Sequence, residues 1–338
     1  MSLKPFFGLL RDGRLSALLS VGAGLKSFYK LTYLAAAGEY GLLCRLANGP
    51  ATLNSLAEFY NAADQGREAL EAWLQMGVRL RLLSLGAGGY SLRGVAAALA
   101  RPENDATLAM VQEVAGLHHK LISATLPKLR RSELWTLGDQ DGELIARSSR
   151  VLEVFQAEVI RDTFPEQGAL RLLEIGCGSG IYLRYAAMRN PSLTAVGMEL
   201  QAAVAEMART NLRNWGLDSR VKIEEGDFRA KALGEQFDIA TLYNNIYYFP
   251  VQERVALLKR IGRFLRPGGF LLLTTCCQGG SIGTEALNLW GAATRGAAGR
   301  LPAEDELVDQ LRQAGYSSVK TKNLVPGERF MSFQAFRG

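Results

Sequence analysis

Histidine and cysteine are scarce in this chain of 338 residues, which has only two histidines and four cysteines. The cysteines show no CxxC spacing and have no nearby histidine at ligand spacing, so we expect no bound metal. Adjacent Cys276 and Cys277 would point to opposite faces of a strand, which argues against one shared zinc site. We interpret the thiols as reduced and expect a cytoplasmic protein.

Long apolar runs and long runs of one charge are also missing. Apolar stretches such as residues 270–275 have the length of a strand, well short of the roughly 18 residues that a membrane span needs. The net charge is +6, and the densest basic cluster, residues 128–131, is short. We therefore expect no membrane span and no nucleic-acid partner. A hydrophobic content of 48% excludes a mainly disordered chain.

The first half of the sequence has the pattern of helices with one small hairpin. Helices are predicted over residues 31–46, from a cap at Thr52 to residue 60, and over 67–83, followed by short strands at 81–85 and 90–92 around a Gly-rich turn. This order is typical of a winged-helix unit. Longer helices are predicted over about 105–129 and 148–163. We expect an N-terminal, mainly helical domain over 1–105 and linking helices over 106–164.

The pattern changes near residue 165. Short apolar runs then alternate with amphipathic segments of helix length, and the runs lie at residues 170–175, 193–198, 221–224, 237–242 and 270–275. Such alternation predicts an α/β domain with a doubly wound, Rossmann-like parallel sheet over 165–338.

Three alternate glycines follow the first of these runs. Glu174 precedes Gly176, Gly178 and Gly180, and a helix is predicted to begin directly afterwards. Glycine is required where backbone takes a positive φ or approaches a ligand closely, and this turn lies at the ligand-binding edge of such a sheet. A dinucleotide fingerprint needs a third glycine at position 181, which is Ile181, so a pyrophosphate is not the expected ligand.

Acidic residues also end the next two runs. Glu199 ends the second run, where a carboxylate is suited to accept hydrogen bonds from two ribose hydroxyls. Asp227 and Phe228 follow the third, where an acid beside an aromatic ring suits an adenine. The ordered set indicates a nucleoside-containing ligand much more strongly than the glycines alone.

On these residues, the chain from about 165 onward resembles the class I S-adenosylmethionine-dependent methyltransferases. Residues 174–180 are similar to their first motif, 238–245 to their fourth-strand motif, and 265–269 to the turn before their fifth strand. The resemblance implies seven strands, the last antiparallel, with S-adenosylmethionine as cofactor. The cofactor-binding residues that it implies are Glu174, Gly176, Gly178, Gly180, Glu199, Leu200, Asp227, Phe228 and Asn244.

The N-terminal half is similar in element order to the dimerisation domain of small-molecule O-methyltransferases. That resemblance implies a homodimer, with residues 106–164 roofing a substrate pocket. It also implies a small-molecule acceptor, most readily an oxygen of an aromatic or polyketide-like metabolite from secondary metabolism.

The catalytic base is the point at which the sequence departs from these enzymes. They commonly carry a histidine after the fourth strand, and Tyr248 lies about where it is expected. The only histidines, His118 and His119, belong to the preceding long helix and are alternative bases from the roof. We expect the substrate pocket to include Tyr243, Asn245, Tyr247 and Trp290, although Trp290 would equally well anchor a Gly-rich loop at 291–299.

Other functions are left open by the sequence. The missing histidine makes methylation at carbon or nitrogen an alternative to methylation at oxygen. Less favoured are a winged-helix regulator that senses S-adenosylmethionine and a pseudo-enzyme that binds the cofactor without transferring its methyl group.

Overall fold

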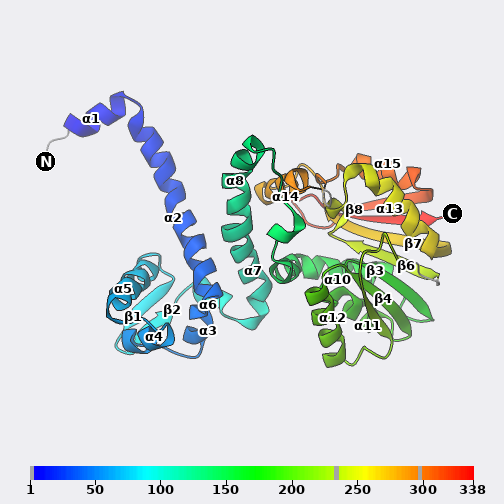
Figure 1. Ribbon diagram of the computed structural model, residues 1–338, viewed down its shortest axis with the longest axis horizontal. Coiled ribbons are helices and arrows are strands. Elements are labelled where there is room, and N and C mark those ends of the chain that lie inside the picture. Colours follow the sequence, from blue (N-terminus) through cyan, green and yellow to red (C-terminus); the bar gives the residue numbers. More distant parts are fainter. Residues whose placement is uncertain (1–3, 232–235, 296–298) are drawn as a thin grey trace. The chain divides into compact units, whose positions relative to one another are not determined.

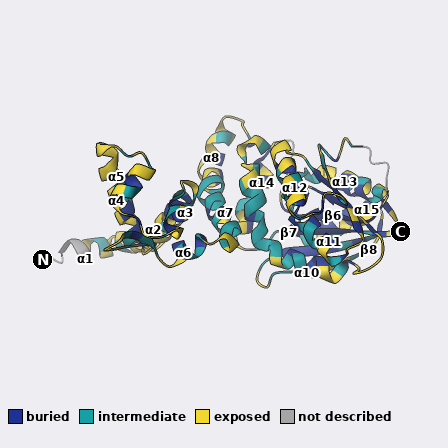
Figure 2. Ribbon diagram, turned by 90° about the horizontal axis from the view of Figure 1, so that it is seen from below, coloured by how far each residue is buried: buried dark blue, intermediate teal, exposed yellow. Residues whose placement is uncertain are grey.

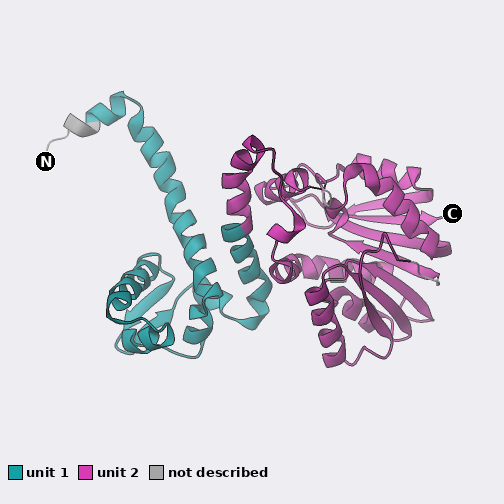
Figure 3. Cartoon of the chain, viewed as in Figure 1, with its two compact units in different colours: residues 1–116 teal, residues 117–338 magenta. Residues whose placement is uncertain are grey.

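The computed structural model describes residues 4–231, 236–295 and 299–338 of the chain. It divides into two compact units, residues 1–116 and 117–338 (Figure 3). The division falls inside the segment 106–164 that the sequence predicts as linking helices. Among the described residues, none of the helices combines the length and apolar character needed to cross a membrane.

The first unit is mainly helical. Its elements are α1 (Lys4–Arg11), α2 (Arg14–Glu39), α3 (Leu42–Ala47), α4 (Leu53–Phe59), α5 (Asp64–Arg79), β1 (Leu83–Gly86), β2 (Gly89–Leu92), α6 (Val95–Leu99) and α7 (Asp105–Glu113), with a 3-10 turn at Pro102–Asn104. The Thr52 side chain accepts a hydrogen bond from the Ser55 N–H at 3.2 Å, which confirms the predicted cap. The predicted single helix over 31–46 is wrong, because Gly41 at φ +79° separates α2 from α3.

Leucines from α3, α4 and α5 and from the hairpin form the core of this unit. Leu42, Leu56, Leu74 and Leu82 are completely buried in it. The observed order of three helices and an antiparallel hairpin is the one predicted from sequence. Its assignment as a winged helix stays a prediction.

The second unit begins with helices that precede the sheet. They are α8 (His119–Arg130), α9 (Gly142–Ser148) and α10 (Glu153–Thr163), with 3-10 turns at Leu137–Asp139 and Ser149–Leu152. A π-helical turn at Val114–His118 joins α7 to α8, so the helix predicted over 105–129 exists with a local widening.

A seven-stranded sheet forms the centre of the second unit (Figure 1). Its strands are β3 (Leu170–Ile175), β4 (Leu193–Glu199), β5 (Val221–Glu225), β6 (Phe237–Tyr243), β7 (Leu265–Cys276), β8 (Tyr316–Asn323) and β9 (Phe330–Arg337). They lie in the order β5-β4-β3-β6-β7-β9-β8. The strands from β5 to β7 are parallel, and β9 is antiparallel to both of its neighbours. The predicted Rossmann-like sheet with an antiparallel last strand is confirmed.

Helices pack on both faces of this sheet. The remaining ones are α11 (Ile181–Arg189), α12 (Ala202–Asn214), α13 (Val251–Phe264), α14 (Ile282–Ala293) and α15 (Glu304–Gln313). One apolar core lies under α13 and α15, and a second lies under α10, α11 and α12. All seven residues of β6 are buried, as expected for a strand covered on both faces (Figure 2). Because β3, β4, β5 and β6 are parallel, their carboxyl ends lie at the same edge of the sheet, where such folds bind ligands.

Candidate active site

The glycine loop between β3 and α11 follows the predicted geometry. Gly176, Gly178 and Gly180 have φ values of +69°, +52° and +79°, which residues with a Cβ rarely adopt. A Cβ on Gly176 would lie 2.1 Å from Asn245 Nδ2, whereas a Cβ on Gly178 would meet no atom within 4 Å. Gly176 therefore permits a close approach within the protein, and Gly178 faces open space.

Glu199 ties this loop to the end of β4. Its carboxylate accepts hydrogen bonds from the Gly178 N–H at 3.0 Å and the Gln201 N–H at 3.1 Å. The two donors fix the carboxylate without neutralising its charge, so it remains able to accept hydrogen bonds from a ligand.

Asp227, at the end of β5, is held by a cation. Arg229 donates to it from its backbone N–H at 2.8 Å and from Nε at 3.0 Å, and this bonding lowers the pKa of Asp227. Arg229 also pairs with Glu253 at 3.1 Å. Phe228 turns into the core, where its ring packs against Phe264.

Aromatic and amide side chains follow β6. The ring of Tyr243 packs edge-on against Tyr182 at 5.3 Å, and those of Tyr247 and Tyr248 lie 4.9 Å apart. Asn245 Nδ2 donates to the Ile175 carbonyl at 2.7 Å. Asn244 has a φ of +51°, a strained value for a residue with a side chain. The buried Oδ1 atoms of both asparagines accept no hydrogen bond from the described residues.

These groups surround one cavity of about 210 Å³ within the second unit. Of the residues predicted for the site, those that line it are Gly176, Gly178, Glu199, Leu200, Asp227, Phe228, Tyr243, Asn244, Asn245, Tyr247 and Tyr248. The sequence analysis thus placed residues from four separate strand ends around a common space.

Comparison with known proteins identifies the part of the chain that forms this cavity. Residues 172–269 match a family model described as a methyltransferase domain. The match indicates a methyltransferase domain over this part of the chain.

Two relatives match parts of the chain. The chain is 26% identical over 196 residues to demethylspheroidene O-methyltransferase of Rhodobacter capsulatus, covering 56% of this chain and 48% of that protein. It is 31% identical over 163 residues to aclacinomycin 10-hydroxylase RdmB of Streptomyces purpurascens, covering 47% and 42%. The matches span less than half the length of either relative.

A solved structure extends the similarity of fold to nearly the whole chain. The mitomycin 7-O-methyltransferase MmcR superposes with a TM-score of 0.79 and 20% identity, covering 97% of this chain and 100% of that one. The methyltransferase domain and the helices before it therefore have the same two-domain fold as MmcR.

Besides the two histidines, three of the predicted residues do not line this cavity. Gly180 begins α11 behind the loop. Trp290 is buried on α14 among Leu121 and Trp135, so it anchors a helix, and residues 296–298 of the predicted loop lie outside the described residues.

Glu174 is the third, and it lies beneath the cavity. It is 1% exposed, and neither carboxylate oxygen has a hydrogen-bond partner in the described part of the chain. Burial, together with the nearby charge of Glu199, raises the pKa of Glu174 well above its usual value. A neutral carboxyl group is the form that this environment favours.

The histidines lie away from this cavity. His119 is exposed at the start of α8, and His118 ends the π-helical turn with partial burial. Neither is among the residues that line the methyltransferase cavity. Their catalytic role stays a hypothesis, without support from this geometry.

Residues that sequence reasoning missed complete the wall. They belong to the segment before the sheet and are Leu137, Gln140, Gly142, Ile145, Ala146, Ser149 and Arg150. Arg150 Nε pairs with Glu153 at 2.7 Å, and Tyr185 donates a hydrogen bond to the same carboxylate at 2.6 Å. No local motif marks Arg150. Its spacing of three residues from Glu153 was the only available signal.

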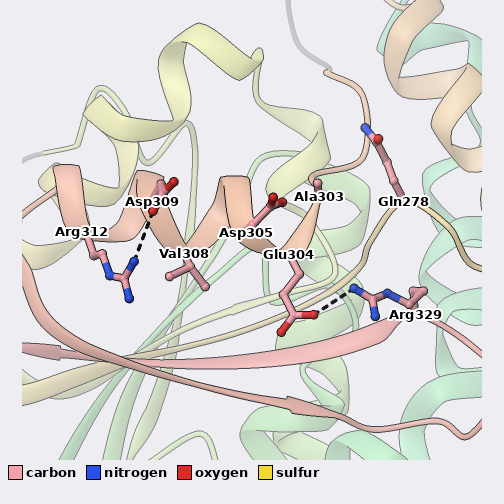
Figure 4. Close-up of a pocket in the computed structure, with 8 residues that line it drawn as sticks. All are labelled: Gln278, Ala303, Glu304, Asp305, Val308, Asp309, Arg312 and Arg329. Atoms are coloured by element: carbon pink, nitrogen blue, oxygen red, sulfur yellow. Dashed lines mark hydrogen bonds and ion pairs between the residues drawn. The ribbon is translucent and has the colours of Figure 1, made fainter.

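A second, open groove lies beside α15 (Figure 4). Two of its carboxylates are already paired, Glu304 with Arg329 at 2.9 Å and Asp309 with Arg312 at 3.3 Å. Exposed pairs of this kind are typical of a solvated surface, and the groove adds no candidate catalytic group.

Proposed function

We propose that this protein transfers the methyl group of S-adenosylmethionine to a small-molecule acceptor. Glu199 carries the proposal, because two backbone N–H groups hold its carboxylate at the rim of a glycine-lined cavity. That arrangement suits a ribose diol, whose two hydroxyls donate to one carboxylate. Asp227 at the next strand end suits the adenine.

The other end of the cofactor carries an amino-acid carboxylate, and this end requires a cation. Arg150 and Arg229 are the two arginines that line the cavity in the described residues. Arg229 is paired with Asp227 and Glu253. Arg150 uses Nε for Glu153, and its planar guanidinium has further N–H groups suited to a carboxylate. We assign Arg150 to the methionine end.

When bound, S-adenosylmethionine supplies an electrophilic methyl group on a sulfonium sulfur. The protein's part is to hold the acceptor in line with it and to exclude water. Tyr243 and Tyr247 give the cavity an aromatic wall that suits a flat, apolar acceptor beside a cation. An oxygen of an aromatic or polyketide-like metabolite is therefore the acceptor that we favour.

Proton removal from such an acceptor falls to Tyr248 in this scheme. The carboxylates that line the cavity, Glu199 and Asp227, belong to the nucleoside end, and no imidazole lines it within the described residues. An acceptor that is ionised beforehand needs no base, and methylation at carbon or nitrogen remains the alternative within the same site.

A hydroxylase among the relatives favours a second candidate, an enzyme that binds the cofactor without methylating its acceptor. Incubation with methyl-labelled S-adenosylmethionine and a metabolite extract separates the two. Label in a product supports methyl transfer, and cofactor binding without any labelled product supports the second candidate.

The cofactor assignment is tested by calorimetric titration of the wild-type protein with S-adenosylmethionine and S-adenosylhomocysteine. We expect micromolar binding of both. A folded protein that binds neither ligand contradicts the proposed function.

We also propose that the protein is a homodimer through its N-terminal helices. Large apolar side chains are exposed along α2, among them Leu18, Leu19, Val21, Leu25 and Phe28. Leu18, Val21, Leu25 and Phe28 lie on one side of the helix, a pattern that suits packing against a second copy. Sedimentation of the wild type is expected to give a dimer, and Leu25→Glu with Phe28→Glu a monomer. A monomeric wild type contradicts this proposal.

A further inference from the structure

Arg254 is a buried arginine that the proposed chemistry does not use. It lies on α13 with none of its surface exposed, and it forms no ion pair with a described residue. Burial lowers its pKa to about 10. Burying a charged side chain without an ion-pair partner destabilises the folded protein, so we expect Arg254 to have a structural role.

The Arg254 guanidinium donates hydrogen bonds to two backbone carbonyls. Nε donates to the Phe249 carbonyl at 3.1 Å, and Nη2 donates to the Arg300 carbonyl. Phe249 follows the short helical turn after β6, and Arg300 follows α14 in the chain. One side chain thus joins two segments about fifty residues apart in sequence.

The same two segments meet again at Gly299. Its N–H donates to the Tyr247 carbonyl at 2.7 Å, and a Cβ on Gly299 would lie 2.8 Å from both the Phe249 oxygen and Arg254 Nη2. There is no room for another side chain there. The backbone that carries Tyr247 and Phe249 is therefore supported from behind by Arg254 and Gly299.

The front of this backbone faces the nucleoside end of the cavity. The Phe249 ring lines the cavity and lies 5.7 Å from the guanidinium carbon of Arg229, the partner of Asp227. Glu253, the residue before Arg254, holds that same guanidinium at 3.1 Å. Arg254 and Glu253, which are adjacent on α13, thus hold the Phe249 backbone and the Arg229 guanidinium, and both of these groups lie beside Asp227.

We propose that Arg254 is a positioning residue that fixes the Phe249 ring beside Arg229 and Asp227 through the carbonyls of Phe249 and Arg300. The proposal rests on the proposed function, in which this end of the cavity receives the adenine. Arg254 itself touches no ligand.

The test compares two ligands that share the nucleoside, S-adenosylhomocysteine and 5′-methylthioadenosine, the second of which lacks the amino-acid part. Arg254→Met removes both carbonyl contacts, and we expect the Kd of both ligands to rise by about tenfold. Arg254→Lys keeps the charge but loses the fork, so an intermediate rise is expected. Arg263→Met, an exposed arginine on the same helix, is the matched control.

Hydrogen exchange supplies a readout that loss of stability alone does not mimic. Below the unfolding temperature, Arg254→Met should speed exchange in residues 246–250 and 299–301 and leave residues 170–199 unchanged. Kd values within about twofold of wild type for folded Arg254→Met overturn the proposal. If Arg254→Met does not fold, the Kd values of Arg254→Lys test the proposal instead. A wild type that binds neither ligand refutes the proposed function instead, and the exchange comparison still tests whether Arg254 fixes this segment.

Discussion

The two sides of the cavity are built on different principles. At the nucleoside end, the two acids that line the cavity are each held by a hydrogen-bond partner, Glu199 by backbone N–H groups and Asp227 by Arg229. On the acceptor side, Tyr243, Tyr247 and Asn245 line the cavity, and the buried Oδ1 of Asn245 accepts no hydrogen bond from described residues. The first side is preorganised for one ligand, whereas the second leaves a polar atom for a ligand to satisfy. We infer that the cofactor is fixed by the fold and that the acceptor is selected by a few side chains.

Removal of Glu199 breaks the nucleoside side most severely. Glu199→Ala deletes two charge-assisted hydrogen bonds to the proposed ribose diol, so the Kd of S-adenosylhomocysteine should rise roughly thousandfold. Calorimetry measures this directly. Glu225→Ala is the control, because Glu225 is an exposed acid paired in register with Glu199 on the next strand. Equal affinities for both variants would remove the ribose assignment.

The acceptor side is tested by substitution of Tyr248, the residue that we propose as the base. Tyr248→Phe should lower kcat by about a hundredfold for an acceptor that is protonated at neutral pH. The rate is measured with methyl-labelled cofactor on the acceptor found in the extract screen. Tyr40→Phe, at an exposed tyrosine, serves as the control. A fall in His119→Ala instead would return the base to the helix before the sheet.

Arg150 provides a test that separates the two ends of the cofactor, because we assign it to the end that would bind the methionine portion. Arg150→Met should raise the Kd of S-adenosylhomocysteine about thirtyfold and leave that of 5′-methylthioadenosine unchanged. Arg161→Met, at an exposed pair on α10, controls for loss of charge. Weaker binding of both ligands would place Arg150 elsewhere than the amino-acid end.

The same contrast explains how far the sequence could predict this site. Gly176, Gly178 and Glu199 were predictable because a positive φ or a strand end restricts which residue can stand there. The resemblance implied that residues 106–164 roof the pocket, but it named none of the lining residues of that segment, such as Arg150, because tertiary packing alone brings them to the cavity. Trp290 was ambiguous for a related reason, since an aromatic residue near glycines suits a core as well as a pocket.

The fold shows the same division between local and tertiary information. Most strands were predicted to within two residues because buried parallel strands have continuous apolar runs, but β7 begins at Leu265, within the predicted turn at 265–269. The break between α2 and α3 was missed because Gly41 stands in an otherwise helical pattern, and only its positive φ reveals the end.

The smallest expected effect concerns Glu174, the buried acid whose carboxylate oxygens have no hydrogen-bond partner among the described residues. The pKa of Glu174 is raised in the folded protein, so as pH rises the unfolded chain loses this proton first, near its usual value of about 4.5. The group therefore lowers the free energy of unfolding as pH rises above that value, by at most about 1.4 kcal/mol per pH unit.

Glu174→Gln keeps the shape of the side chain and removes the titration. Its melting temperature should equal that of the wild type near pH 4.5 and exceed it by a few degrees, roughly the effect of 1 kcal/mol, near pH 7. Thermal unfolding at both pH values, without ligand, measures the difference, and Glu158→Gln, an exposed acid on α10, should show none. If Glu174→Gln is instead less stable at pH 7, the carboxylate is ionised and paired in the folded protein. In that case both acids at the nucleoside side are fixed charges, and the contrast between Glu174 and Glu199 disappears.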